Sequence, residues 1–476
     1  MAQESVTRTE PAPGLTAEAI ARRVAARELS PVAVVEAALA RVAEWNPSLN
    51  AIVTLNERAL ADARALERRL ATGALAGALA GVPVGIKDVT QVAGVRTTFG
   101  SPLYADHVPE HDAVVVERLR AAGAIILGKT NTPEFAAGGN TWNDVFGRTR
   151  NPWDPGKSAG GSTGGGAVGL ATGMIALAEG TDLGGSLRIP ASFCGVVGLR
   201  PSPGLVPTVP TDFVWDTLQV SGPMARTALD LALMLQAIAG PTALAPLRQP
   251  VEGRDFVAAV RRGPRAGLRV GYCADIAGIG IDPRVEAVCR RAADRLATNG
   301  VAVDLVDLDL REGRDAFLAL RGHWFASWMS ERLDRLDGFG VNVRNNTRAG
   351  VEAVGMDIGR AETVRGRIWH TFHELFRRYD HILTPTMAVP PFPVEQNYPD
   401  TVAGKTMRTY VDWLAPTFVL SLTGLPVASV PCGLDGDGMP VGMQVVGPPM
   451  GEEAVLALAA RFQELCPVGS PPLTRT

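Results

Sequence analysis

Two stretches near the start of the chain place apolar residues three and four positions apart, which is the spacing of an amphipathic helix. Thr16 precedes the first stretch, AEAIARRVAAREL (17–29). Ser30 precedes the second, PVAVVEAALARVAEW (31–45). A hydroxyl side chain at this place can accept a hydrogen bond from the first free backbone N–H groups of a helix. The pattern therefore predicts two helices with defined starts.

Further along, short apolar runs alternate with segments of helical spacing. Strands are expected at 81–89, 124–127, 174–180, 268–272, 301–308, 381–385, 428–433 and 441–447. Helices are expected at 56–71, 112–122, 160–172, 227–238, 283–297, 311–335, 359–378, 407–422 and 452–464. Apolar strands separated by helices are typical of an α/β protein whose sheet is covered on both faces.

The chain of 476 residues contains no long polar linker and no repeat of 20–50 residues. The proline-rich stretch 241–267 is the best candidate for an internal boundary. We nevertheless expect one domain over residues 15–476, preceded by a flexible tail at residues 1–14. The tail has no apolar core of the kind that a signal peptide needs.

Composition excludes several classes of protein. A net charge of −3 and a pI near 6.1 give no reason to expect nucleic acid or an anionic membrane as a partner. The chain contains no run of eighteen apolar residues, so the sequence predicts no membrane span. The five cysteines are widely spaced and form no CxxC pair, which favours a reducing, cytoplasmic location over a disulfide framework.

The most unusual segment is the glycine-rich stretch from 156 to 200. Within it, LGGS (183–186) can turn several successive backbone N–H groups toward one point, where they could stabilise a developing oxyanion. Ser186 stands at the end of this turn. A simple flexible turn before a helix is the alternative interpretation.

A serine nucleophile needs a base, and Lys87 is the conspicuous candidate. The chain has only four lysines, and this one lies in the apolar segment GVPVGIKDV (81–89). Burial there would favour the neutral amine, which can accept a proton. The alternative role for Lys87 is an ion pair with Asp88 or another carboxylate. The six histidines lie in segments that are more typical of solvated or capping positions.

Several motifs, in order along the chain, resemble the amidase signature family. They include GVPVGIKD (81–88), GAIILGKTNTPEF (123–135), GGSTGGG (160–166), GTDLGGSLRIPASFCGVVGLRPS (180–202) and GLPVASVPCG (424–433). Lys87 and Ser162 are 75 residues apart, and Ser162 and Ser186 are 24 apart, as in that family. The resemblance covers residues 15–465 and implies a large mixed central β-sheet covered by helices on both faces.

The resemblance also implies roles for individual residues. Ser186 would be the nucleophile, Ser162 the bridging serine on a cis peptide bond, and Lys87 the base. The backbone N–H groups that would form the oxyanion hole are those of Leu183, Gly184, Gly185 and Ser186. Three further residues would support the loop, namely Thr163, where many members have serine, Asp182 and Arg188. We expect no cofactor, because this chemistry needs none, and no metal site, because no HExxH motif or Cys/His cluster is present.

Three other interpretations have sequence support. GAIILGKT (123–130) fits the P-loop pattern, although its AIIL segment reads as the strand itself. GKSAG and GGSTG fit the G-x-S-x-G pattern of α/β-hydrolases with a histidine base, with His370 or His381 as candidates, but a proline-broken loop precedes them. The A subunit of the tRNA-dependent amidotransferase shares the signature and is the third alternative.

The substrate is expected to be a small amide, anilide, carbamate or ester. By resemblance, Ala136, Ala137, Gly138 and Gly139 should line the acyl side of the cleft, with Trp142 nearby. Other aromatic residues that could form pocket walls are Phe146, Phe213, Trp215, Trp324, Trp328 and Trp413. Together they favour an apolar or aryl substrate. A homodimer would agree with the resemblance, since dimers are common among similar proteins.

Overall fold

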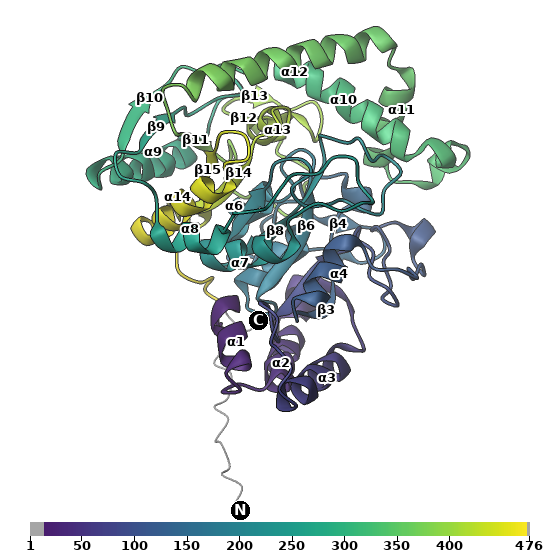
Figure 1. The fold of residues 1–476 in the computed structure, drawn as a ribbon. Coiled ribbons are helices and arrows are strands. Elements are labelled where there is room, and N and C mark those ends of the chain that lie inside the picture. The colour runs from purple at the N-terminus through teal and green to yellow at the C-terminus, as the bar shows by residue number, and fades with distance from the viewer. Residues whose placement is uncertain (1–13, 474–476) are drawn as a thin grey trace, which may run out of the picture.

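The computed structural model describes residues 14–473, so the expected tail lies outside the described residues except for Gly14. One mixed sheet of eleven strands crosses the molecule, and helices cover both of its faces (Figure 1). The strands are β1 (Ile52–Leu55), β2 (Pro83–Lys87), β3 (Ile125–Thr130), β6 (Leu177–Asp182), β7 (Val197–Arg200), β8 (Val220–Ala225), β9 (Arg269–Tyr272), β10 (Ala302–Leu305), β11 (His381–Pro385), β14 (Val427–Leu434) and β15 (Pro440–Val446).

The order across the sheet is β1-β3-β2-β6-β8-β7-β14-β15-β11-β9-β10. Strand β2 is parallel to both β3 and β6, and β9 is parallel to both β10 and β11, whereas the other neighbours are antiparallel. Two short hairpins lie outside this sheet: β4 (Trp142–Asn143) with β5 (Gly147–Arg148), and β12 (Thr401–Val402) with β13 (Lys405–Thr406).

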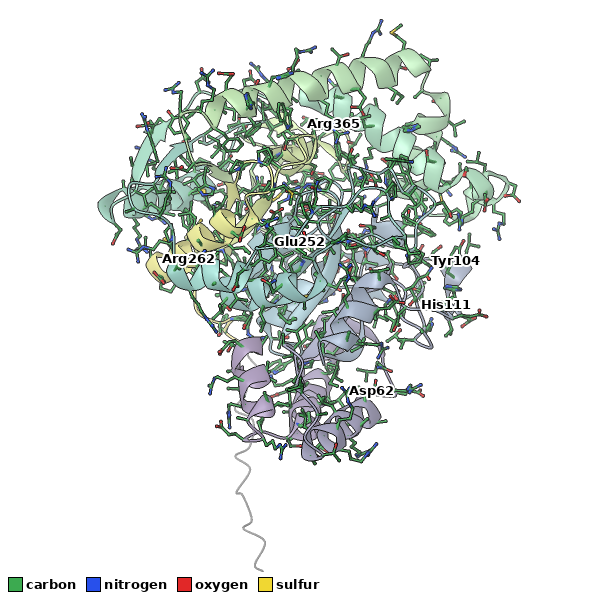
Figure 2. The ribbon with its side chains drawn as sticks, in the orientation of Figure 1. Asp62, Tyr104, His111, Glu252, Arg262 and Arg365 are labelled. Atoms are coloured by element: carbon green, nitrogen blue, oxygen red, sulfur yellow. The ribbon has the colours of Figure 1, made fainter. Side chains whose placement is uncertain are left out.

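The helices follow the expected alternation with the strands. They are α1 (Ala17–Ala25), α2 (Pro31–Leu49), α3 (Ala59–Ala71), α4 (Val114–Ala121), α5 (Gly164–Ala171), α6 (Arg188–Cys194), α7 (Ala228–Ile238), α8 (Phe256–Arg262), α9 (Pro283–Thr298), α10 (Gly313–Trp328), α11 (Val341–Glu352), α12 (Gly355–Leu375), α13 (Ala415–Ser421) and α14 (Glu452–Leu465). Helices α1–α3 and helices α10–α12 lie at opposite ends of the molecule (Figure 1). Figure 2 shows the same separation between Asp62 on α3 and Arg365 on α12.

Both predicted helix starts are confirmed. The Thr16 hydroxyl accepts the N–H of Ala19 at 3.1 Å, and the Ser30 hydroxyl accepts the N–H of Val32 at 3.2 Å. Among residues 14–473, no helix is long and apolar enough to cross a bilayer.

Some expected boundaries were wrong. The helix expected at 311–335 ends at Trp328 and continues only as a 3₁₀ turn, Ser330–Gly338. The helix expected at 407–422 is shortened to α13. The stretch 241–267 contains α8, which packs against α7 and α14, and the single domain expected over residues 15–476 stays a prediction.

Candidate active site

Lys87 ends strand β2 with a fully buried side chain. Its Nζ lies 2.7 Å from the Oγ of Ser162 and 3.0 Å from the Oγ1 of Thr181. Burial lowers the pKa of Lys87 to about 7, although the carboxylates of Glu179 and Asp182 act in the opposite direction. The lowered pKa favours the neutral amine, which is the form that a base acting on the Ser162 hydroxyl would need.

Ser162 lies directly before α5, where the backbone packs very closely. The peptide bond between Gly161 and Ser162 is cis, as the resemblance implies. A Cβ atom on Gly161 would lie 2.8 Å from the carbonyl oxygen of Gly138 and 2.9 Å from the carbonyl carbon of Gly139. Only glycine fits between these backbone segments, so the sequence GGS places the Ser162 hydroxyl against the Lys87 amine.

Ser186 lies on the turn between β6 and α6 and is half-buried, unlike the fully buried Ser162. The backbone N–H of Thr163 donates to the Ser186 carbonyl oxygen at 3.2 Å and ties the two serine segments together. The side chain of Thr163 packs close to Gly180 and Gly166. In the part of the chain that the structure describes, the Ser162 and Ser186 hydroxyls form no hydrogen bond with each other. The proton transfer between these two hydroxyls is therefore a proposal.

The turn 183–186 offers fewer free N–H groups than the resemblance implies. The N–H of Gly185 donates to the Oδ1 of Asp182 at 2.8 Å and is therefore engaged in the loop. Within residues 14–473, the N–H groups of Leu183, Gly184 and Ser186 donate to no protein acceptor. Three of the four expected donors are therefore without a protein acceptor among the described residues, and the oxyanion hole itself stays a prediction.

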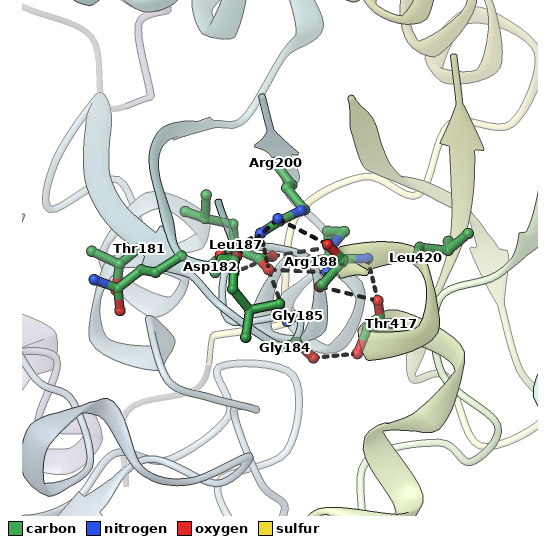
Figure 3. A network of polar contacts seen from close by, with 12 residues as sticks. Thr181, Asp182, Gly184, Gly185, Leu187, Arg188, Arg200, Thr417 and Leu420 are labelled. Atoms are coloured by element: carbon green, nitrogen blue, oxygen red, sulfur yellow. Dashed lines mark hydrogen bonds and ion pairs between the residues drawn. The ribbon is translucent and has the colours of Figure 1, made fainter. Parts of the chain in front are cut away.

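Asp182 is the centre of a buried ion network beside this turn (Figure 3). Arg188 donates to both carboxylate oxygens, at 2.9 and 3.0 Å, and Arg200 approaches Oδ1 at 3.4 Å. Burial alone would raise the pKa of Asp182, but the two guanidinium groups and the N–H of Leu187 hold it well below its usual range. Arg188 also donates to the carbonyl oxygen of Thr417, so the network joins the turn to α13.

A cavity of about 330 Å³ meets this site at Thr181, whereas Lys87, Ser162 and Ser186 are not part of its lining. Thr181 is part of the cavity wall, and its hydroxyl accepts a hydrogen bond from the Lys87 amine. The cavity is therefore one side chain away from the candidate base. Six aromatic side chains share the lining with polar residues such as Gln91, Asp212 and Arg332; the six are Phe99, Tyr104, Phe135, Phe213, Trp324 and Trp328. Tyr104, on the segment before α4, lies at an edge of the molecule (Figure 2).

The rings of this cavity hold one another in place. The ring centroids of Phe135 and Trp328 are 4.9 Å apart, and those of Trp324 and Trp328 are 4.7 Å apart. The indole N–H of Trp324 donates to the Oδ2 of Asp216 at 2.6 Å. The result is a pre-formed aromatic wall rather than a set of loose side chains.

The expected substrate loop divides into three parts. Ala136 lines the cavity. Ala137, Gly138 and Gly139 are buried, and the latter two pack against Gly161, so this part of the loop supports the Ser162 turn. Trp142 does not line the cavity. Its ring stacks under Arg148, with the guanidinium 5.1 Å from the ring centroid, and its N–H points to Asn397.

The aromatic residues that the sequence suggested as pocket walls divide in the same way. Phe213, Trp324 and Trp328 belong to the cavity, whereas Trp413 is core and Trp215 is mostly exposed. Three further rings of the cavity had not been selected, namely Phe99, Tyr104 and Phe135. Phe99 and Phe135 have positive φ angles, a rare backbone state that no local sequence pattern indicated.

The competing motifs do not form the sites that their patterns indicate. GKT of the P-loop-like segment lies inside β3, with Lys129 fully buried, so there is no phosphate-binding turn. His381 is buried on β11, where burial lowers its pKa to about 4, and His370 lies on α12. Among the described residues, no histidine hydrogen-bonds to Ser162 or Ser186, so the α/β-hydrolase interpretation was wrong. The same part of the chain contains no group of three or more metal-ligating side chains.

Comparisons with known proteins find relatives over almost the whole chain. A family model described as Amidase matches residues 33–456. An acylamidase from Rhodococcus erythropolis is 38% identical over 95% of this chain and 96% of its own length. The A subunit of the glutamyl-tRNA(Gln) amidotransferase from Chloroflexus aggregans is 35% identical, again over 95% and 96% of the two chains. The crystal structure of a bacterial aryl acylamidase matches with a TM-score of 0.89 at 28% identity, over 95% of this chain and 96% of that chain.

Proposed function

Since the chain belongs to the amidase signature family, we propose that it is a serine hydrolase that works without a partner protein and cleaves aryl amides, anilides and carbamates. The observation that carries the proposal is the buried Lys87 amine, 2.7 Å from the Ser162 hydroxyl and next to an aromatic cavity. Family membership supports hydrolysis of amides, and the cavity supports the aromatic preference.

In the proposed first step, the neutral Lys87 amine takes the proton of Ser162 while Ser162 takes the proton of Ser186. The Ser186 oxygen attacks the substrate carbonyl carbon, and the resulting oxyanion is stabilised by the N–H groups of Leu183, Gly184 and Ser186. One such donor is typically worth about 3–4 kcal/mol in the transition state. The proton then returns through Ser162 to the leaving nitrogen, and the C–N bond breaks.

The second half of the reaction repeats these roles with water as the nucleophile. Water loses a proton through Ser162 to Lys87 and attacks the acyl group on Ser186. The tetrahedral intermediate collapses, Ser186 regains its proton and the carboxylic acid leaves. A carbamate follows the same route, and its acid product loses CO₂.

The amidotransferase relatives make a glutaminase subunit the competing function. We would assay the purified chain alone on a p-nitroanilide, benzamide, an aryl carbamate and glutamine. The proposal expects turnover of an aryl amide, anilide or carbamate with no added protein. If glutamine were the only substrate hydrolysed, or if activity appeared only with an amidotransferase partner, the chain would be a glutaminase subunit and not a stand-alone hydrolase.

The pH profile tests the base. Because the neutral amine is the active form, kcat/KM should fall as the pH drops through about 7, the pKa to which burial lowers Lys87. We would measure kcat/KM on one neutral anilide between about pH 5 and about pH 9. A profile that stays flat through neutrality would exclude Lys87 as the proton acceptor.

The aromatic wall gives a second test. Replacing Trp328 by alanine should raise KM for an aryl substrate about fivefold to tenfold, the usual worth of a stacked ring pair, and should change acetamide hydrolysis much less. Trp369→Ala is the matched control, because this tryptophan lies on α12, 37% exposed and outside the cavity. An equal decrease in kcat/KM for aryl and alkyl substrates would show that Trp328 acts only in folding.

A further inference from the structure

Arg332 lies in the lining of the aromatic cavity, and the proposed reaction gives it no role. It belongs to the 3₁₀ turn Ser330–Gly338, which follows α10. Its Nε donates to the hydroxyl of Tyr104 at 2.7 Å, and its Nη1 donates to the carbonyl oxygen of Trp328 at 3.1 Å. Tyr104 and Trp328 belong to the same lining, so the guanidinium is held against the cavity wall from two sides.

These two hydrogen bonds leave much of the guanidinium unused. An arginine side chain has five N–H donors, so three of them have no protein acceptor in the part of the chain that the structure describes. Within residues 14–473, no carboxylate forms an ion pair with Arg332. Its acidic neighbours on the turn, Glu331 and Asp334, are exposed to solvent. The cavity wall therefore carries an uncompensated positive charge with unused donors.

Two other charged or basic side chains share the lining, namely Asp212 and His107. Asp212 is exposed and precedes Phe213, whose ring centroid lies 6.1 Å from that of His323 on α10. His323 comes nine residues before Arg332, which corresponds to roughly 13 Å along a helix. Asp212 therefore belongs to another part of the wall. The exposed His107 ring can donate a hydrogen bond and does not repel an anion.

A carboxylate on an aromatic ring is the group that this cavity fits. The planar N–H donors of a guanidinium match the two oxygens of a carboxylate. The rings of Phe135 and Trp328, whose centroids are 4.9 Å apart, offer contacts to an aryl group. The lining extends from Thr181, which contacts the candidate base, to Tyr104 at an edge of the molecule, where it holds Arg332 (Figure 2).

We propose that Arg332 is a specificity-determining residue: it binds a carboxylate on the ring of an aryl amide or carbamate, so that the protein favours ring-carboxylated substrates over their neutral counterparts. This inference rests on the proposed amide hydrolysis and narrows the aryl class. The aromatic wall contacts the ring, and Arg332 contacts the charged group on it.

The test measures kcat/KM on two matched pairs of amides that differ in one ring substituent. They are p-carbamoylbenzoate with p-methylbenzamide, and p-acetamidobenzoate with p-methylacetanilide, so the carboxylate lies once on the acyl group and once on the leaving group. In Arg332→Gln, the preference for the carboxylate member of at least one pair should fall about tenfold to 100-fold, as expected for a lost hydrogen-bonded charge pair. Arg332→Lys keeps the charge and should restore part of the preference.

Arg335→Gln is the matched control, because Arg335 lies on the same 3₁₀ turn, is exposed and is not part of the lining. It should leave both ratios unchanged. A purely structural role of Arg332 would lower kcat/KM equally for both members of a pair. If Arg332→Gln does not fold, Tyr104→Phe gives the same test, since it removes the hydroxyl that orients the guanidinium and should lower the same ratio.

Binding is measured separately by calorimetric titration with p-aminobenzoate and p-toluidine, which need no turnover. Wild type should bind p-aminobenzoate more tightly, and Arg332→Gln should lose this difference. The inference is overturned if wild type has no preference for the carboxylate, or if the preference survives unchanged in Arg332→Gln. If wild type hydrolyses none of the four amides, the proposed function is overturned instead, and the titration still decides whether Arg332 binds the carboxylate.

Discussion

Replacing Ser186 by alanine should lower kcat by about 10⁵-fold to 10⁶-fold, with little change in the binding of substrate. The loss is this large because the variant has no atom that can form the acyl-enzyme. The oxyanion donors and the cavity would remain and could only support slow attack by water. We would measure single-turnover hydrolysis of an anilide and, in parallel, look for the acyl-enzyme by mass spectrometry.

Ser158→Ala is the matched control for this experiment. Ser158 and Ser162 are the two serines that lie in G-x-S-x-G patterns. Ser158 is buried, and its hydroxyl donates to the side-chain oxygen of Asn140 at 2.7 Å. Its loss should cost stability of about 1 kcal/mol and leave the chemistry in place. If Ser158→Ala removed the activity and Ser186→Ala kept it, the nucleophile would be Ser158.

The candidate residues of the site could be selected from sequence through local signals together with the family resemblance, and their catalytic roles stay predictions. Lys87 is a rare lysine in an apolar strand, and Ser162 and Ser186 each follow a pair of glycines. A short window of sequence indicates both burial and a backbone conformation that only glycine can adopt. The structure places the Lys87 amine and the Ser162 hydroxyl in contact.

The cavity could not be predicted in the same way. Its rings come from segments as distant as Phe99, Phe213 and Trp328, and only the sheet brings these segments together. The capture of the Gly185 N–H was also missed, because it depends on where the Asp182 carboxylate points. The short strands β1, β7 and β8 have weak patterns of their own and are stabilised by pairing with their neighbours.

Replacing Asp182 by asparagine should destabilise the protein by about 3–5 kcal/mol, which is the usual cost of breaking a buried ion pair from one side. The side chains of Asp182, Arg188 and Arg200 are all fully buried, so the two guanidinium groups would lose their counter-charge with no access to water. The amide also replaces a carboxylate oxygen that accepts from Gly185 or Leu187. We therefore expect a lower urea midpoint together with a lower kcat.

The difference in unfolding free energy between wild type and Asp182→Asn should depend on pH if the charge of Asp182 causes it. Asp182 has a depressed pKa in the folded state, so its stabilisation is complete above the ordinary aspartate pKa of about 3.9 and is lost as the pH falls below it. The gap in unfolding free energy between wild type and Asp182→Asn should therefore be constant near neutrality and shrink below about pH 4. Asp294→Asn, which breaks an exposed pair with Arg290, should cost less than about 1 kcal/mol at neutral pH. If Asp182→Asn were no more costly than this control, the turn that presents Ser186 would be held by packing and not by the buried carboxylate.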